Sequence, residues 1–265
     1  MEMTLGLGLV VGGIMALTGA GGGILAVPLL VFGAGLVMTQ AAPIGLLAVG
    51  VSAALGAALG LKAGIVRYKA ALLMAAVGML FAPIGVWVGG RIDNRWLSVL
   101  FATVLLFVAY RTFRQAGSAE SNHERQDTTL PCIRSDETGR FIWTTRCARA
   151  MATSGGIAGL LSGLLGVGGG FVIVPALQRS TDLAMQSVVA TSLAVIALVS
   201  VSGVASSALS GGLNWSVAYP FTGGALAGML GGRLVAGFLA GPQLQRGFGI
   251  VSGMVAIGMI VKTFA

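Results

Sequence analysis

The chain has 265 residues, of which 56% are hydrophobic and only 9% are charged, and its mean hydropathy is +0.94. Soluble domains carry about a quarter charged residues, so this composition excludes an ordinary soluble protein and indicates a polytopic α-helical membrane protein. The formal net charge of +8 does not indicate nucleic-acid binding, because the basic residues lie between apolar blocks, where orientation in a membrane accounts for them.

Eight apolar spans follow one another along the chain, at residues 4–33, 42–61, 70–90, 96–113, 148–178, 183–209, 217–239 and 246–264. The opening residues lack the basic region of a signal peptide, so we expect the first span to be retained. The one long polar stretch, residues 115–140, separates the fourth span from the fifth and is typical of an exposed connector. We therefore expect a first transmembrane repeat at 1–114, a connector at 115–146 and a second transmembrane repeat at 147–265.

The basic residues predict the orientation of the chain. Lys62, Arg67 and Lys69 lie between the second and third spans, and seven arginines lie between residues 111 and 149, which together make ten of the sixteen Lys and Arg. Positive charge accumulates on the cytoplasmic side of membrane proteins. The sequence therefore predicts a cytoplasmic connector.

The two halves share a motif. "GAGGGILAVPLL" at 19–30 and "GVGGGFVIVPAL" at 166–177 match at seven of twelve positions, and "GGRI" at 89 corresponds to "GGRL" at 231. This similarity predicts an internal duplication of about four segments per half. Such repeats are typical of secondary transporters, whose binding sites lie where the repeats meet.

The glycine triplets interrupt apolar spans in an unusual way. Glycine tolerates positive φ and leaves its N–H uncovered, and a Val-Pro pair begins four residues after each triplet, where the proline removes a helical hydrogen bond. We expect half-helices that restart near Ile24 and Phe171 and direct their N–H groups at a cavity, where they would bind an anion. Glycines also allow helices to pack closely, which is the favoured explanation for isolated pairs such as Gly211–Gly212. The expected substrate-binding glycines are Gly21, Gly22, Gly23, Gly168, Gly169 and Gly170, and the expected structural positions are Gly19, Pro28, Gly166 and Pro175.

Five further side chains are candidates for substrate binding. Gln40, Thr191 and Ser192 each follow a glycine motif at a similar distance, and Arg91 and Arg233 occupy matching positions in the two halves. Each has an ordinary alternative role, because hydroxyls often bond to a carbonyl one turn back and arginines at span ends extend to the interface.

The chemistry that the sequence lacks also narrows the function. All eight Asp and Glu fall at the N-terminus, in the connector or at span ends, which favours an anionic substrate over a cation. One histidine, His123, and two cysteines, Cys132 and Cys147, make neither a metal site nor a disulfide framework. We therefore expect no metal, no cofactor and no enzymatic activity.

The sequence leaves two topologies open. Each segment that contains a glycine triplet is either one long broken span, which gives four crossings per half and parallel repeats, or a re-entrant hairpin, which gives three crossings and inverted repeats. The basic segments share one side in both arrangements, so their charge does not decide between them. We favour the re-entrant, inverted arrangement, with about seven to eight transmembrane helices in all.

The paired Gly-x-Gly-Gly-Gly-x-x-x-Val-Pro-x-Leu motifs, with the polar segment between the halves, resemble the TauE/SafE sulfite exporter family over nearly the whole chain. The resemblance implies a multi-pass carrier of the bacterial inner membrane that moves sulfite, sulfonates, sulfoacetate or related anions. We expect a carrier that works by alternating access, with the anion bound between the glycine motifs. An anion channel-like pore, or a permease for another small organic anion, is the alternative. A homodimer is compatible with the sequence.

Overall fold

The computed structural model describes residues 2–118, 132, 144–181, 183–239 and 242–264. Within these ranges the chain forms ten α-helices and one 3₁₀-helix, and its only extended pairing is a single bridge between Cys132 and Thr181. The predicted all-α class is confirmed for this part of the chain.

The elements divide at the connector. The first group is α1 (Glu2–Thr18), the 3₁₀-helix η1 (Gly19–Leu25), α2 (Ala26–Gly33), α3 (Met38–Lys62), α4 (Tyr68–Gly89) and α5 (Asn94–Ser118). The second group is α6 (Thr145–Leu165), α7 (Gly170–Ser180), α8 (Met185–Leu209), α9 (Trp215–Leu239) and α10 (Pro242–Phe264).

Within the described residues, four helices are long and apolar enough to cross a bilayer, namely α3, α4, residues 94–112 of α5, and α8. Shorter apolar helices cover residues 2–17, 22–33 and 249–263. Large apolar side chains such as Leu80, Phe107 and Leu234 are mostly exposed on the outside of the bundle, where lipid would cover them. These features agree with the expected polytopic membrane protein.

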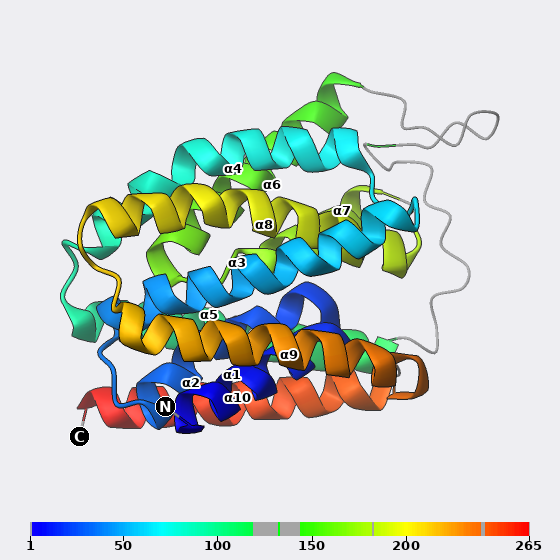
Figure 1. Ribbon diagram of the computed structural model, residues 1–265. Helices are drawn as coiled ribbons and strands as arrows, with labels where there is room; N and C mark the ends of the chain where they lie inside the picture. Colours follow the sequence, from blue (N-terminus) through cyan, green and yellow to red (C-terminus); the bar gives the residue numbers. More distant parts are fainter. Residues whose placement is uncertain (1, 119–131, 133–143, 182, 240–241, 265) are drawn as a thin grey trace.

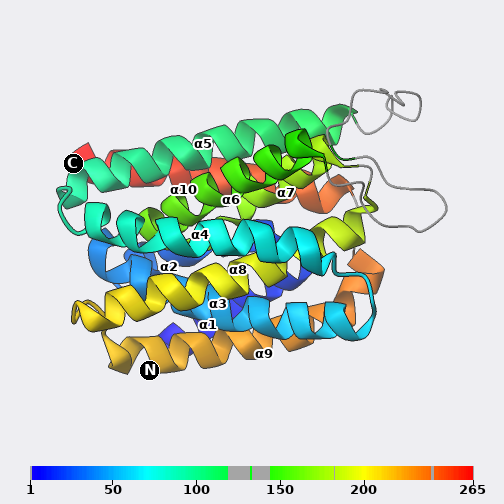
Figure 2. The same ribbon diagram turned by 90° about the horizontal axis from the view of Figure 1, so that it is seen from above.

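The helices lie roughly side by side, and the short ones do not run the full length of the bundle. Figures 1 and 2 show α1 running inward from the end at which both termini lie, and α2 returning to that same end, where α3 begins. They show α6 running inward from the opposite end and α7 returning to it, where α8 begins. Helices α3, α4 and α5, and then α8, α9 and α10, run from one end to the other.

The two groups interlock through close helix pairs. Helix α1 packs mainly against α9, α6 against α4, α3 against α8, and α5 against α10. In the first pair, a Cβ added to Gly8 or Gly12 would overlap the carbonyls of Phe221 or Ala225. In the second, a Cβ added to Gly159 would overlap the backbone of Gly78. Glycines therefore allow main chain to touch main chain in both pairs.

A disulfide joins Cys132 to Cys147 in the first turn of α6. Both cysteines are buried, and the N–H of Cys132 donates to the carbonyl oxygen of Ser180, the last residue of α7, at 3.1 Å. Cys132 thus ties the start of α6 to the end of α7. Sequence analysis gave these two cysteines no structural role, and the structure corrects that interpretation.

Candidate functional site

The second glycine segment, residues 166–170, has a left-handed backbone that requires glycine. Gly166, Gly168 and Gly169 have φ values of +72°, +73° and +69°. Gly166 ends α6, and its N–H donates to the carbonyl oxygen of Ser162 at 2.9 Å, while Gly169 precedes the first turn of α7. Side chains other than glycine are disfavoured in this conformation, so the local sequence accounts for the sharp reversal between α6 and α7.

The first glycine segment, residues 19–25, differs from the expected open backbone because it forms the 3₁₀-helix η1. Pro28 is the third residue of α2, within the first turn, where the missing N–H removes no helical hydrogen bond. Pro175, by contrast, is the sixth residue of α7 and lies inside that helix. The two copies of the motif therefore fold differently. The surroundings of Gly19 and Gly21 lie outside the described part of the structure.

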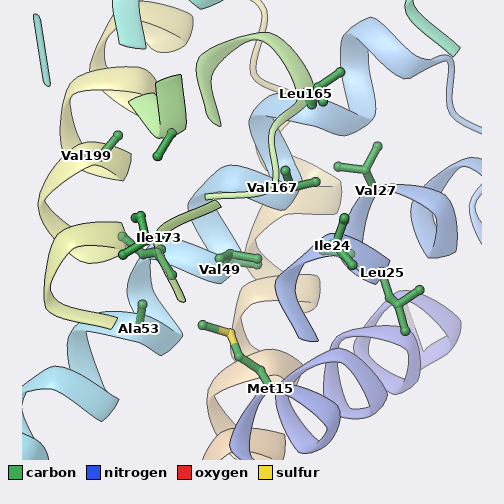
Figure 3. Packing of buried hydrophobic residues seen from close by; sticks show 14 of the residues in the cluster. Met15, Ile24, Leu25, Val27, Val49, Ala53, Leu165, Val167, Ile173 and Val199 are labelled. Carbon is green, nitrogen blue, oxygen red and sulfur yellow. The ribbon is translucent and has the colours of Figure 1, made fainter. Parts of the chain in front are cut away.

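The structure brings the two glycine segments together at Val49 of α3. A Cβ on Gly23 would lie 3.0 Å from Val49 Cγ1 and 3.3 Å from the carbonyl oxygen of Val167. A Cβ on Gly168 would lie 2.9 Å from the same Val49 Cγ1. Figure 3 shows the Val49 side chain with Ile24 and Val167 near it, and all three are 1% exposed. The two segments are therefore in contact, and apolar side chains fill the space between them.

Close packing accounts for several motif glycines in this arrangement. A Cβ on Gly22 would overlap the backbone of Met15, and one on Gly169 would approach the carbonyl oxygen of Ala158 at 2.5 Å. Gly170 is buried at the start of α7. The binding role expected for these glycines stays a prediction.

A pocket of about 620 Å³ opens between the start of α3, the end of α4 and the ends of α6 and α8. Its floor adjoins the second glycine segment, because Gly163 and Leu164 line it just before Gly166, and a Cβ on Gly166 would overlap the backbone of Ala42, which also lines it. The pocket residues are Thr39, Gln40, Ala42, Pro43, Leu46, Val86, Trp87, Gly89, Gly90, Arg91, Leu97, Gly163, Leu164, Ser206, Ser207, Ser210 and Gly212.

Two of the predicted binding residues meet in this pocket. Gln40 comes from the first turn of α3, and Arg91 follows the end of α4. The guanidinium carbon of Arg91 lies 3.9 Å from the centre of the Trp87 ring, a cation–π contact that holds the positive charge at the pocket wall. An amide and a guanidinium are suitable donors to an anion.

Three serines near the end of α8, Ser206, Ser207 and Ser210, add polarity to the pocket and were not singled out from the sequence. The hydroxyl of Ser207 donates to the carbonyl oxygen of Gly203, and that of Ser210 to the carbonyl oxygen of Ser206. The signal for them was the run "SSALS" at the end of an apolar span.

The remaining candidates lie elsewhere. The Thr191 hydroxyl oxygen accepts from the N–H of Arg67 at 3.0 Å, and the Ser192 hydroxyl donates to the carbonyl oxygen of Val189 at 2.8 Å. Both residues are fully buried in the first turns of α8, at the opposite end of that helix from the pocket. The structure therefore does not bring them to Gln40 and Arg91, and their role in binding stays a prediction. The side chain of Arg233 lies outside the described residues.

No group of three or more His, Cys, Asp or Glu that could hold a metal occurs among the described residues. The pocket donors are the amide of Gln40, the hydroxyl of Ser206 and the guanidinium of Arg91, groups that can donate to an oxyanion.

Comparison with known proteins supports a membrane role. A family model described as Sulfite exporter TauE/SafE matches residues 4–259. Proteins named "Probable membrane transporter protein" from two Xylella fastidiosa strains, 9a5c and Temecula1 / ATCC 700964, are 33% and 31% identical to this chain and cover 99% of it and 96% of their own lengths. "Probable membrane transporter protein YunE" of Bacillus subtilis strain 168 is 27% identical over 86% of this chain and 84% of its own. No solved structure matches the chain significantly.

Proposed function

Because the chain belongs to the sulfite exporter TauE/SafE family, we propose that it carries small sulfur-containing oxyanions, such as sulfite, sulfonates or sulfoacetate, across a bacterial inner membrane. Membership of this family, with relatives named as membrane transporters that match over nearly their whole length, identifies it as a multi-pass membrane transporter. What we propose beyond this is the identity of the substrate as a sulfur oxyanion, the direction of transport as export, and the alternating-access mechanism.

The pocket is the observation that carries the choice of an anion. Arg91 supplies its positive charge, Gln40 and Ser206 supply neutral donors, and no Asp or Glu contributes to its wall. A compact oxyanion would form charge-assisted hydrogen bonds to these groups. The Arg91 guanidinium lies at the pocket wall and the deeper lining residues are neutral. This arrangement would favour release of the anion as well as its binding.

We propose that the halves are inverted repeats, each made of a re-entrant hairpin and three spans. The matching motifs support this pairing of α1 with α6, η1–α2 with α7, and α3, α4 and α5 with α8, α9 and α10. Under this pairing the contact of α1 with α9 corresponds to that of α6 with α4. The opposite directions from which the two hairpins enter the bundle also support it (Figures 1 and 2).

The basic residues support an orientation for this arrangement. Lys62, Arg67 and Arg146 lie at the end of the bundle where α3 ends and α6 begins, whereas the pocket with Arg91 lies at the opposite end. The positive-inside rule assigns the first end to the cytoplasm. The pocket would then open to the outside, and the apolar contact of Val49 with both glycine segments would separate it from the cytoplasm.

Transport by purified protein in proteoliposomes tests the function. Vesicles are loaded with sulfite, sulfoacetate, thiosulfate or sulfate, and efflux is measured with and without a pH gradient, against vesicles that lack protein. We expect saturable efflux and counterflow of sulfite or a sulfonate. Non-saturable flux without counterflow would instead indicate a channel-like pore, and absence of flux for every sulfur anion would overturn the proposal.

A further inference from the structure

Three buried serine hydroxyls in the middle of the bundle have no hydrogen-bond partner within the described part of the chain. They belong to Ser52 of α3, Ser162 of α6 and Ser200 of α8, which are 0%, 0% and 2% exposed. Other buried hydroxyls, such as that of Ser207, donate to a carbonyl one turn back. A buried polar group without a partner opposes folding, so these three hydroxyls require an explanation.

All three serines lie one helical turn from a residue that touches, or belongs to, a glycine segment. Ser52 follows Val49, which contacts the positions of Gly23 and Gly168. Ser200 follows Ile196, whose Cγ2 would lie 2.8 Å from a Cβ on Gly168. Residues three or four apart share one face of a helix, so each hydroxyl belongs to the helix face that meets the glycine segments.

The third serine connects this region with the pocket. The carbonyl oxygen of Ser162 accepts from the N–H of Gly166, and its neighbour Gly163 lines the pocket floor. Ser200 lies on the other side, where its hydroxyl oxygen would be 3.0 Å from a Cβ on Gly50, the residue after Val49. Ser162 therefore lies between the pocket floor and the second glycine segment, and Ser200 lies beside the residue that follows Val49.

We propose that Ser52, Ser162 and Ser200 are the ligands of the transported oxyanion when it passes Val49 between the two glycine segments. This proposal rests on the proposed function and extends it to residues of the inner site. Sulfite has acceptor oxygens and no donor when fully ionised, which suits hydroxyl donors placed along its path past Val49. Hydrogen bonds to a charged acceptor are stronger than those between neutral groups, so binding the anion would give a partner to hydroxyls that have none within the described residues.

Single alanine variants of the three serines, assayed for sulfite efflux and thermal unfolding, test the proposal. We expect Ser52→Ala, Ser162→Ala and Ser200→Ala each to raise the sulfite concentration at half-maximal flux about tenfold or more, because a bond to a charged group is lost. The unfolding temperature in detergent is expected to stay unchanged or to rise, because an unpaired buried hydroxyl is removed. A serine with a purely structural role would not combine a higher half-saturating sulfite concentration with an unchanged or higher unfolding temperature.

Ser252 is a matched control, because it is also 0% exposed and also unpaired within the described residues, but lies on α10, which packs mainly against α5. Ser252→Ala should leave the sulfite concentration at half-maximal flux unchanged. If the three variants behave like Ser252→Ala while the wild type transports sulfite, this proposal is wrong and the proposed function stands. If the wild type transports no sulfur anion, the proposed function fails and this proposal fails with it.

Discussion

The amine of Lys262, in the last turn of α10, donates to the carbonyl oxygen of Val31, near the end of α2, at 3.1 Å. The same ammonium lies 5.2 Å from the centre of the Phe32 ring. A cation at the C-terminus of a helix satisfies an orphan carbonyl and interacts favourably with the helix dipole. Helix α10 therefore stabilises the C-terminal end of α2.

Replacing Lys262 should destabilise the packing of the C-terminal end of α2. We expect Lys262→Met to lower the free energy of unfolding by about 1 kcal/mol, because the charge and its hydrogen bond at the helix end are lost. Lys262→Arg keeps both and serves as the control. Thermal unfolding in detergent measures the difference, and equal stability of the two variants would show that this contact contributes nothing.

Arg91 should determine how strongly the pocket attracts anions. We expect Arg91→Gln to raise the sulfite concentration at half-maximal flux about tenfold, since a charge-assisted bond is worth about 1.5–3 kcal/mol. Arg95, which does not line the pocket, supplies the control Arg95→Gln. Because salt screens exposed charges, the defect of Arg91→Gln should shrink between low and high ionic strength. A defect of equal size in Arg95→Gln would contradict a specific role for Arg91.

The contact between Gly23 and Val49 can be tested by a double-mutant cycle. Gly23→Ala should destabilise the protein, because the new Cβ would lie 3.0–3.1 Å from the two methyl groups of Val49. Val49→Ala removes those methyl groups and should restore much of the loss in the double variant, which gives an interaction energy of about 0.5–3 kcal/mol.

Gly168→Ala provides the comparison for that cycle. Its Cβ would also meet Val49, but φ at Gly168 is +73°, and a left-handed backbone costs a residue with a side chain about 1–2 kcal/mol. Val49→Ala should therefore rescue Gly23→Ala more completely than Gly168→Ala. Equal rescue, measured by thermal unfolding, would show that crowding alone acts at both positions.

The disulfide should stabilise the start of α6. Cys132 and Cys147 are 15 residues apart, and closing a loop of that length contributes about 3 kcal/mol in the chain-entropy treatment. A reducing agent should therefore lower the unfolding temperature of the wild type to that of Cys147→Ser, and leave Cys147→Ser itself unchanged. An unchanged wild type would show that the bridge does not contribute to stability.

The long apolar helices were predictable from the sequence because their signal is local. Residues 42–61 and 70–90 correspond closely to α3 and α4, and the charge pattern marked the ends of both. Gln40 and Arg91 were chosen separately, one for its distance from a motif and the other for its repeat position, and the structure brings them into one pocket.

The features that sequence spacing did not indicate have a common physical cause, which is that they depend on partners far away in the chain. Thr191 looked equivalent to Gln40 by spacing, but its hydroxyl is occupied by the N–H of Arg67, 124 residues away. Likewise, the two glycine motifs, which match at seven of twelve positions, form a 3₁₀-helix in one half and three left-handed glycines in the other. Sequence spacing cannot distinguish these outcomes, because they are decided by the packing of helices from different halves.

The positions of the two chain ends distinguish the inverted arrangement from the parallel one. With re-entrant hairpins each half crosses the membrane three times, so the connector lies on the opposite side from both termini. With long broken spans each half crosses four times, and the connector lies on the same side as both termini. The basic residues near the connector assign it to the cytoplasm in either case, so only the inverted arrangement exposes the termini outside.

Small epitope tags at the N-terminus, at the C-terminus and in the connector, probed in intact and in permeabilised cells, measure these positions. We expect both terminal tags to be labelled in intact cells and the connector tag only after permeabilisation. Protection of the terminal tags would contradict the inverted repeats and would also remove the outward direction proposed for the pocket, because that direction follows from the same crossings. The contacts among Val49, Gly23 and Gly168 do not depend on the orientation, so the double-mutant cycle at that position would keep its meaning in either case.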